Sequence, residues 1–464
     1  MGFLAYDLAL LVLFLAFLTY FLFRNRHNLR RQGIVLLYHA KWGIKFFDEV
    51  VKRYRKILIP AKYVSIAIGY VLMAIIVWAF ARSTWLYLNF PVTQIIKAPP
   101  LMPLIPYFPR LFGLESFFPP LYFTYFLVAL LIVMIAHEGS HGIFARLEGF
   151  KIKSTGFLFL GPIIGAFVEP DEKRMSKAPK LKQMSVLSAG VFANVLVGAL
   201  FFLVMAAFFT TAFQPAGVKF FDYSSAVLNL SQVKEVRNAS VDGYLELVTE
   251  NQSYFVKKEM FELAKDKVEI VLAYTDTPAF RSQLRGAILS IDGKPTPNLD
   301  ALREALSSHK PGDKVKILTA VSENARDSEA KEKEYTLTLA ERDGKAFLGI
   351  ATLNRGANGV IGWLYEQTFA RVRNPNIYYT SLLGSFGWFV HYLLWWVVVI
   401  NLLVAIFNML PFPALDGGRF FYLTALGLAK DNEKIANAVF KLVSAAIIFM
   451  AILMMLKWFI GVAF

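Results

Sequence analysis

The sequence predicts a polytopic α-helical membrane protein, with about six transmembrane helices and an inserted soluble α+β domain. Three observations predict this class. Hydrophobic residues make up 56% of the 464 residues. Charged residues make up 18% of the chain, against about a quarter in ordinary soluble domains. The apolar residues gather in long runs, each close to or above the ~20 residues that a helix needs to cross the hydrocarbon core.

The apolar runs define the expected spanning helices in chain order. They cover residues 3–23, 63–81, 121–145, 184–213, 384–409 and 436–459. Pro411 and Pro413 follow the fifth run directly, and proline breaks a helix because it lacks a backbone donor and clashes with the preceding turn. We therefore expect the fifth helix to end before these prolines.

A stretch of different composition separates the fourth and fifth runs. It is mixed, charged and rich in turn residues, which is typical of a soluble domain inserted between membrane helices. Strand-like runs are expected at residues 267–274, 286–294, 313–321 and 333–340, and a helix at 299–309. Residues 218–262 either add strands to this domain or form a second unit, and the sequence leaves both open.

The basic residues are distributed unevenly over the short loops. Residues 24–56 carry ten Lys and Arg and residues 146–182 carry eight, whereas residues 82–110 carry three. The positive-inside rule then places the first two loops in the cytosol, so that the N-terminus and the insert are extracytosolic. The net charge of +15 is explained by this bias and by contact with the lipid bilayer, and no nucleic-acid partner is expected.

Two histidines and a glutamate lie within the third apolar run. His137, Glu138 and His141 form an H-E-x-x-H pattern, which on a helix places both imidazoles on one face. Two such nitrogens suit one zinc ion, and Glu138 is placed to act as a general base. Ionisable residues inside a membrane are costly and usually functional. Glu138 precedes Arg146 by eight residues, which places it ~12 Å below the cytosolic surface at 1.5 Å per residue.

A catalytic zinc site needs a third protein ligand, and Asp416 is the best candidate. It is the only acidic residue between Gln367 and Asp431, and it follows the broken fifth helix on the cytosolic side. The alternative is that Asp416 caps a helix beginning at Gly417. Asn408 is expected to hydrogen-bond Asp416 behind the metal, or to satisfy backbone groups freed by the prolines. The chain has no cysteine, so a thiolate site is excluded.

Together the two motifs resemble those of the site-2 protease family, which are intramembrane zinc metalloproteases. That family pairs H-E-x-x-H with N-x-x-P-x-x-x-x-D-G, and residues 408–417 match the second pattern position by position. The resemblance implies one Zn²⁺ bound by His137, His141 and Asp416, with Glu138 as catalytic base. The resemblance covers roughly residues 123–427.

Two further stretches resemble the family. Gly190 and Asn194 match its pattern of a small residue and an asparagine on the fourth helix. Glycine lets helices approach closely, and Asn194 either donates a hydrogen bond to the developing oxyanion or bonds a neighbouring helix.

Residues 154–172 are apolar but interrupted by glycine and proline, and the resemblance implies a sheet that dips into the membrane. Gly161, Ile164 and Gly165 are the substrate-binding candidates on this sheet, because an exposed edge accepts an extended peptide.

The insert resembles a permuted PDZ domain over residues 276–317, although Ala287 stands where the usual turn has aspartate. Such a domain is expected to bind a substrate C-terminus or strand. The chain is thus expected to divide into residues 1–120 with the first two spans, 121–213 and 356–464 as the two halves of the catalytic core, and 214–355 as the extracytosolic insert.

The protein is expected to be an integral protein of the cell membrane that cleaves single-span membrane proteins within the bilayer. Its expected role is in regulated intramembrane proteolysis. Two alternatives come from other classes. A non-catalytic PDZ scaffold would keep partner binding without cleavage, and a metal or proton transporter would use the intramembrane His, Glu and Asp as a relay.

Overall fold

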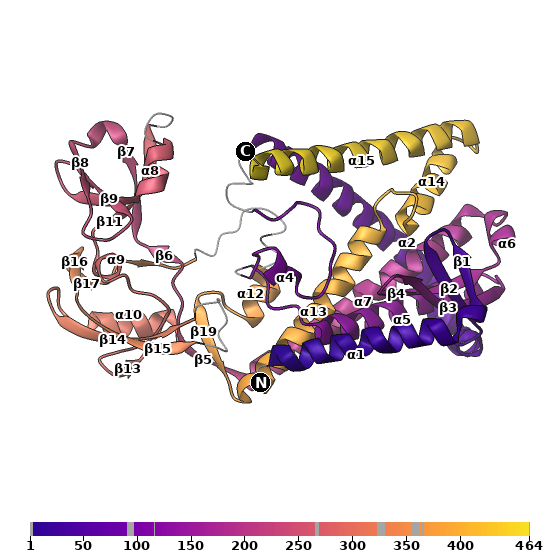
Figure 1. Ribbon diagram of the computed structural model, residues 1–464, viewed down its shortest axis with the longest axis horizontal. Helices are drawn as coiled ribbons and strands as arrows, with labels where there is room; N and C mark the ends of the chain where they lie inside the picture. Colours follow the sequence, from indigo (N-terminus) through magenta and orange to yellow (C-terminus); the bar gives the residue numbers. More distant parts are fainter. Residues whose placement is uncertain are drawn as a thin grey trace. The chain divides into compact units, whose positions relative to one another are not determined.

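The computed structural model of the chain describes residues 3–90, 97–115, 117–264, 269–322, 330–353, 362 and 366–463. Within these ranges, six helices are long and apolar enough to cross a membrane, as predicted (Figure 1). They are α1 (Phe3–Arg24), α2 (Ile44–Asn89), α5 (Phe123–Leu147), α7 (Lys180–Ala212), α13 (Gly384–Asn408) and α15 (Glu433–Ala463).

Helix α2 is much longer than the predicted span of residues 63–81. It has 46 residues, with non-helical dihedrals at Tyr54 and a proline at Pro60. A helix of this length extends about 70 Å, more than twice the hydrocarbon thickness, so part of it lies outside the apolar layer. The prediction missed this part because its basic residues lower the mean hydropathy below that of a membrane span.

The chain divides into two compact units. The first contains residues 1–205 and 391–464, and the second contains residues 206–390. The predicted insert, residues 214–355, lies inside the second unit.

The predicted end of the fifth span is confirmed, because α13 ends at Asn408 and the next helix, α14 (Asp416–Leu428), begins after the two prolines.

The first unit has a shared apolar core to which α2, α5, α7, α13 and α14 contribute. Its buried members include Leu72, Phe144, Ala189, Met409 and Phe420. Membrane helices associate through close packing rather than through loss of water, and small residues at the contacts permit this. A Cβ at Gly69 of α2 would meet Met409, Phe420 and Ser188 at 3.3 Å, so this glycine fits its crossing closely.

A four-stranded antiparallel sheet lies beside the third spanning helix. Its strands, in spatial order, are β1 (Leu29–Gln32), β2 (Val35–Ala40), β3 (Ile152–Leu160) and β4 (Ile163–Pro170). β3 and β4 form a hairpin in which Leu160 pairs with Ile163. Its two-residue turn has Gly161 at φ +58 followed by Pro162, which suits a turn that requires positive φ at its first position. The apolar but helix-breaking segment is therefore a sheet, as expected.

A buried aspartate joins the first helix to the third. Asp7 of α1 is 1% exposed. Its carboxylate accepts hydrogen bonds from the backbone N–H groups of Phe123 (2.7 Å) and Thr124 (2.9 Å), from the Thr124 hydroxyl (2.5 Å) and from the Tyr107 hydroxyl (2.6 Å). The carboxylate thus satisfies the first N–H groups of α5, which have no partner within their own helix.

The second unit contains two larger sheets. A six-stranded sheet has the order β15-β14-β12-β5-β19, with β13 paired to β12. It packs with α10 (Leu299–Ser307) around a core that includes Val218, Ile288, Leu302 and Ile317. These strands are β5 (Phe213–Val218), β12 (Ala287–Ile291), β13 (Lys294–Pro295), β14 (Lys314–Val321), β15 (Lys331–Thr338) and β19 (Ile377–Ser381). The α+β character of the insert follows from this arrangement.

Within the second unit, residues 225–275 contribute a five-stranded antiparallel sheet of their own and do not add strands to the six-stranded sheet. Its order is β7-β11-β10-β9-β8, and it has its own core around Leu228, Leu247 and Ala273. The strands are β7 (Ser225–Asn229), β8 (Glu235–Asn238), β9 (Tyr244–Val248), β10 (Ser253–Lys257) and β11 (Ile270–Thr275). The first residues of the run predicted at 267–274 lie outside the described residues.

The other described elements are short. They are η1 (Arg26–Asn28), α4 (Phe108–Leu111), α6 (Glu172–Ser176), β6 (Asp222–Tyr223), η2 (Leu230–Gln232), α8 (Lys258–Ala264), α9 (Pro278–Arg281), β16 (Ala340–Arg342), β17 (Lys345–Phe347), β18 (Ile350–Ala351) and α12 (Phe369–Val372).

Candidate metal centre

The H-E-x-x-H residues lie on α5, as the apolar run predicts. His137 and His141 are one turn apart, with ring centroids 4.7 Å apart and planes inclined by 81°. Their side chains are 9% and 13% exposed, so both rings point into the helix bundle rather than towards lipid. This spacing brings the two Nε2 atoms to 3.1 Å from each other.

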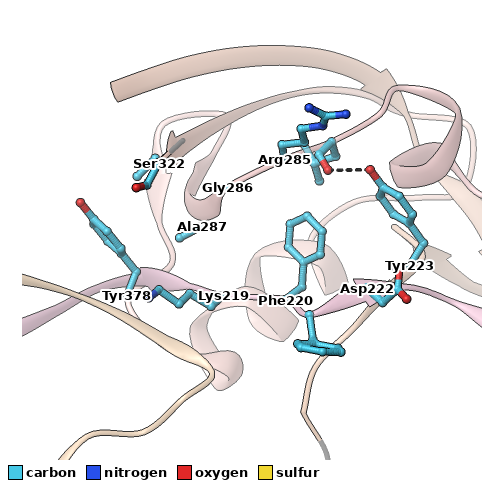
Figure 2. Close-up of a pocket in the computed structure, with 12 residues that line it drawn as sticks. Lys219, Phe220, Asp222, Tyr223, Arg285, Gly286, Ala287, Ser322 and Tyr378 are labelled. Carbon is cyan, nitrogen blue, oxygen red and sulfur yellow. Dashed lines mark hydrogen bonds between the residues drawn. The ribbon is translucent and has the colours of Figure 1, made fainter. Parts of the chain in front are cut away.

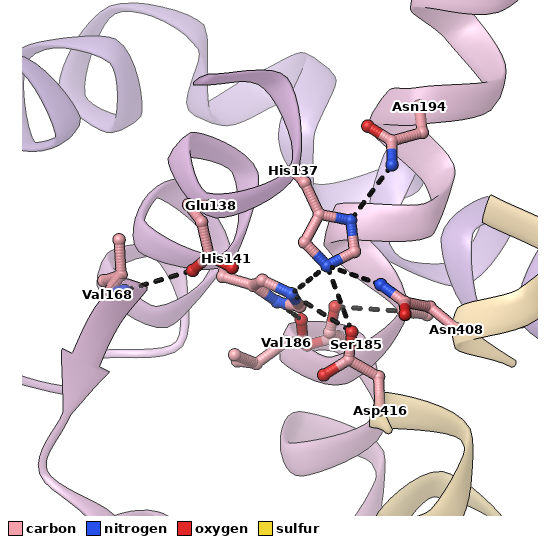
Figure 3. A network of polar contacts seen from close by, with 10 residues as sticks. His137, Glu138, His141, Val168, Ser185, Val186, Asn194, Asn408 and Asp416 are labelled. Atoms are coloured by element: carbon pink, nitrogen blue, oxygen red, sulfur yellow. Dashed lines mark hydrogen bonds and ion pairs between the residues drawn. The ribbon is translucent and has the colours of Figure 1, made fainter. Parts of the chain in front are cut away.

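Asp416 completes a triangle with the two imidazoles. Its Oδ2 lies 3.2 Å from Nε2 of His137 and 3.3 Å from Nε2 of His141. Figure 3 shows the three side chains converging from α5 and from the first turn of α14. The structure therefore brings together the three residues that the sequence predicts as metal ligands, although they lie up to 279 positions apart in the chain.

The spacing of these three atoms fits a tetrahedral metal ion. Zinc bonds to imidazole nitrogen and carboxylate oxygen measure roughly 2.0–2.1 Å, so two ligands of a tetrahedral ion stand about 3.3 Å apart. The three measured separations are 3.1, 3.2 and 3.3 Å. The donor set of two imidazoles and one carboxylate, which leaves a fourth position open, is the set that catalytic zinc uses.

Glu138 lies beside the triangle. One of its carboxylate oxygens is within 4.8 Å of ligand atoms of His137 and His141. Its Oε2 accepts a 3.0 Å hydrogen bond from the backbone N–H of Val168 on β4. Val168 was not among the predicted site residues, and no pattern in the sequence reveals it because the contact uses a backbone atom. The bond fixes the direction in which the Glu138 carboxylate points.

The path of the chain before α14 explains how Asp416 reaches the histidines. A Cβ at Gly417 would collide with the backbone of Met409, and one at Gly418 with the carbonyl of Phe412. Two glycines therefore let the start of α14 fold tightly against the end of α13. The alternative capping role of Asp416 is wrong, since Leu415 occupies the N-cap position and Asp416 is the first helical residue.

Asn408, the last residue of α13, contacts an imidazole. Its Nδ2 lies 3.2 Å from Nε2 of His137. Asn408 was expected to hydrogen-bond Asp416. Its side chain instead contacts His137, the imidazole that Asp416 also contacts. The last turn of α13 and the first turn of α14 both deliver a side chain to His137.

Helix α7 contacts the far side of both rings. Nδ1 of His141 lies 2.7 Å from the carbonyl oxygen of Val186, and Nδ1 of His137 lies 3.1 Å from Nδ2 of Asn194. A Cβ at Gly190 would lie 2.6 Å from Nε2 of His141 and 2.7 Å from the ring of His137. The oxyanion role expected for Asn194 stays a prediction, and its observed contact is with an imidazole.

The predicted substrate-binding residues all lie on the β3–β4 hairpin. Gly161 forms the turn, whereas Ile164 and Gly165 lie on β4, the edge strand of the sheet. In an antiparallel pair, alternate residues direct both backbone groups away from the partner strand. Because Val168 turns its N–H to Glu138, Ala166 and Ile164 direct theirs to the same outer edge. Gly165 instead directs its backbone groups towards β3, where it pairs with Leu158.

Other histidines have different partners. Nδ1 of His39 lies 2.9 Å from the Ser154 hydroxyl, and Nε2 of His309 lies 3.0 Å from the Asp292 carboxylate.

The second unit has an open cleft of about 380 Å³ beside β5 and β6, lined by both polar and apolar side chains (Figure 2). Its lining includes Lys219, Arg285 and Ser322. Tyr223 donates a 2.9 Å hydrogen bond to the carbonyl of Leu284. Burial raises the pKa of Tyr223 to about 12, so this phenol stays neutral and remains a donor at physiological pH.

Comparison with known proteins identifies relatives of this arrangement. The family model described as Peptidase family M50 matches residues 125–454, which include every predicted metal ligand. An uncharacterized protein of Methanocaldococcus jannaschii is 42% identical over 72 residues. That match covers 15% of this chain and 20% of the relative, so the chain matches about a fifth of that protein's length.

Proposed function

Because the chain belongs to peptidase family M50, we propose that it is an intramembrane zinc metalloendopeptidase of the site-2 protease type. Its substrates are membrane-anchored proteins that cross the bilayer once, and its reaction is hydrolysis of a peptide bond within or next to their spanning segment. The observation that carries the proposal is the triangle formed by His137, His141 and Asp416, with edges of 3.1–3.3 Å, inside a bundle of apolar helices.

In this proposal the imidazoles of His137 and His141 and the carboxylate of Asp416 hold one Zn²⁺. Bound there, zinc supplies a Lewis acid that polarises a peptide carbonyl and makes water easier to deprotonate. Two neutral imidazoles and one carboxylate would cancel only one of the two positive charges of Zn²⁺. The remaining positive charge would stabilise the developing oxyanion. The apolar core around the site keeps the dielectric low, which strengthens these interactions.

Glu138 is the general base and then the general acid. It takes a proton as water adds to the carbonyl carbon, and it returns that proton to the amide nitrogen as the C–N bond breaks. The products are one new carboxyl terminus and one new amino terminus. The hydrogen bond from Val168 supports this role, because it holds the carboxylate towards the metal ligands instead of letting it rotate away.

The outer edge of β4 is the proposed substrate platform. Ile164 and Ala166 direct backbone groups to the same edge as Val168, whose N–H reaches Glu138. A peptide added along this edge would pass the general base in extended form. Extension is required because a helix shields its peptide bonds with its own hydrogen bonds, so the substrate helix must unwind before attack.

The distribution of basic residues supports an orientation with the site nearer the cytosolic side of the cell membrane. The N-terminus and the second unit are then extracytosolic. We propose that the six-stranded sheet and α10 form a PDZ-like module for a substrate strand or C-terminus. The cleft beside Lys219 and Arg285 supports this, because its two cations outnumber its one carboxylate, Asp222, and so suit an added carboxylate. A role in regulated intramembrane proteolysis would follow from such recognition.

The test is Glu138→Gln in the full-length protein, with zinc content and cleavage measured on the same sample. The expected result is full zinc occupancy with cleavage of a single-span substrate in proteoliposomes reduced at least about 100-fold. The matched control is Glu172→Gln, the same change at an exposed position on α6, which should retain cleavage.

Several outcomes separate the alternatives. Unchanged cleavage by the Glu138→Gln protein refutes the proposal. A scaffold would bind partners equally well in both forms without cleaving them, and a transporter would show altered ion flux instead. Asp416→Ala should lose zinc, and full occupancy in this variant would remove Asp416 from the ligand set.

A further inference from the structure

Three groups on one face of α7 contact the two imidazoles. They are the carbonyl of Val186, the backbone at Gly190, where the rings leave no room for a Cβ, and the carboxamide of Asn194, spaced four residues apart. Residues at this spacing lie above one another along a helix. Figure 3 shows Val186 and Asn194 at the two ends of this row, one beside each ring.

The two imidazole rings use the same nitrogen for the same kind of neighbour. In each ring, Nε2 points to Asp416 and Nδ1 points to α7. A neutral imidazole carries one proton, so a ring that gives its Nε2 lone pair to a metal carries the proton on Nδ1. Nδ1–H then needs an acceptor. For His141 that acceptor is the carbonyl oxygen of Val186, at 2.7 Å.

For His137 the only acceptor that Asn194 can offer is its Oδ1. This oxygen is buried and has no hydrogen-bond partner among the residues that the structure describes, whereas Nδ2 faces the ring. The oxygen and nitrogen of a carboxamide exchange places when the group turns by 180°. With a proton on Nδ1, the contact with Nδ2 would set two donors against each other. Turning the group removes this conflict and breaks no hydrogen bond at Oδ1.

We infer that Asn194 is a positioning residue, which accepts the Nδ1–H of His137 and thereby aims Nε2 at the metal. The inference rests on the proposed zinc site and assigns Asn194 a role different from donation to the oxyanion. It makes α7 the element that sets the tautomer of both ligand histidines. Groups that orient a metal-bound histidine in this way are worth roughly 10–100-fold in metal affinity.

Two substitutions at Asn194 distinguish an acceptor from a donor. Ionised aspartate can accept a hydrogen bond but cannot donate one, and leucine can do neither. If Asn194 positions His137, Asn194→Asp retains zinc affinity, kcat and KM within a few-fold of the wild type. Asn194→Leu weakens zinc binding by roughly 10–100-fold. Zinc affinity is measured by competition with a chromophoric chelator, on the full-length protein in detergent.

Asn401 provides the matched control. It is a buried asparagine on α13 whose Oδ1 also lacks a partner within the described part of the chain, and its Nδ2 donates to the carbonyl of Val397. Asn401→Leu should lower the melting temperature of the metal-free protein about as much as Asn194→Leu does, without the loss of zinc affinity. This comparison separates a loss of positioning from a general loss of folding.

The outcomes decide between the roles. An Asn194→Leu protein with wild-type zinc affinity overturns the inference. So does an Asn194→Asp protein that binds zinc normally but has lost kcat, because that result shows a donor to the reaction. If the wild type itself binds no zinc, or cleaves no membrane substrate, the proposed function fails. If the wild type is loaded and active, only the role of Asn194 is at issue.

Discussion

Gly190 lies where α7 approaches the metal ligands, and adding one methyl group there should disrupt the centre. In Gly190→Ala, the new Cβ would stand 2.6 Å from Nε2 of His141 and 2.7 Å from two ring atoms of His137. An ordinary contact begins at 3.4 Å, so the rings or the helix must move by about 0.8 Å.

The required displacement can be compared with the tolerance of a metal site. Ligand distances in such sites hold to within about 0.2 Å. A shift about four times larger separates the two imidazoles from Asp416. We expect zinc affinity to fall at least about 100-fold, which is about 2.8 kcal/mol at 1.4 kcal/mol per tenfold.

The assay is chelator competition on full-length protein, together with cleavage of a single-span substrate. Gly139→Ala is the matched control, since Gly139 lies between the histidines and a Cβ there would meet nothing within 4 Å. This variant should keep its zinc. If Gly190→Ala binds zinc as tightly as the wild type does, the close approach of α7 does not constrain the ligands, and the steric argument is refuted.

Three other substitutions and one metal-removal experiment give further expected results. Val168→Pro removes the N–H that holds Glu138 while sparing the ladder to β3, so kcat should fall about 10–100-fold with zinc retained; Val168→Ala should leave kcat unchanged. Asp7→Asn should destabilise the protein by about 1.5–3 kcal/mol, seen as a lower melting temperature with unchanged zinc content. Gly349→Ala, at φ +87 and in collision with Thr277, should make the second unit more susceptible to limited proteolysis while zinc stays bound. Dialysis against a chelator should abolish cleavage and added Zn²⁺ should restore it; cleavage that survives complete zinc removal would contradict the metal-dependent reaction.

The three proposed metal ligands could be identified from sequence, because each carries a signal in its own neighbourhood of the chain. His137 and His141 share a helix face by their spacing alone. Asp416 could be found because it is the only acidic residue in a long apolar region and follows two prolines. The spanning helices were equally accessible, since length and hydropathy decide whether a segment crosses a membrane.

The rest of the site depends on contacts that sequence patterns do not encode. Val168 and Val186 act through backbone atoms, which every residue possesses, so their side chains gave no signal. The contact of Asn194 with His137 depends on how α7 packs against α5, which helix periodicity does not determine. The sequence also left open whether residues 218–262 add strands to the insert or form a second unit, because short strands are distinguished by their pairing more than by their composition.

The position of Asp7 imposes an order on the assembly of the protein during synthesis. Its partners at Tyr107, Phe123 and Thr124 lie 100–117 residues later in the chain. At roughly 5–20 residues per second, a ribosome needs on the order of 5–25 s to reach them. Throughout that interval the carboxylate lacks these donors, and α1 has no helix terminus to bind. The first helix therefore reaches its final place only after the third has been made, so α5 becomes the template on which an earlier part of the chain docks.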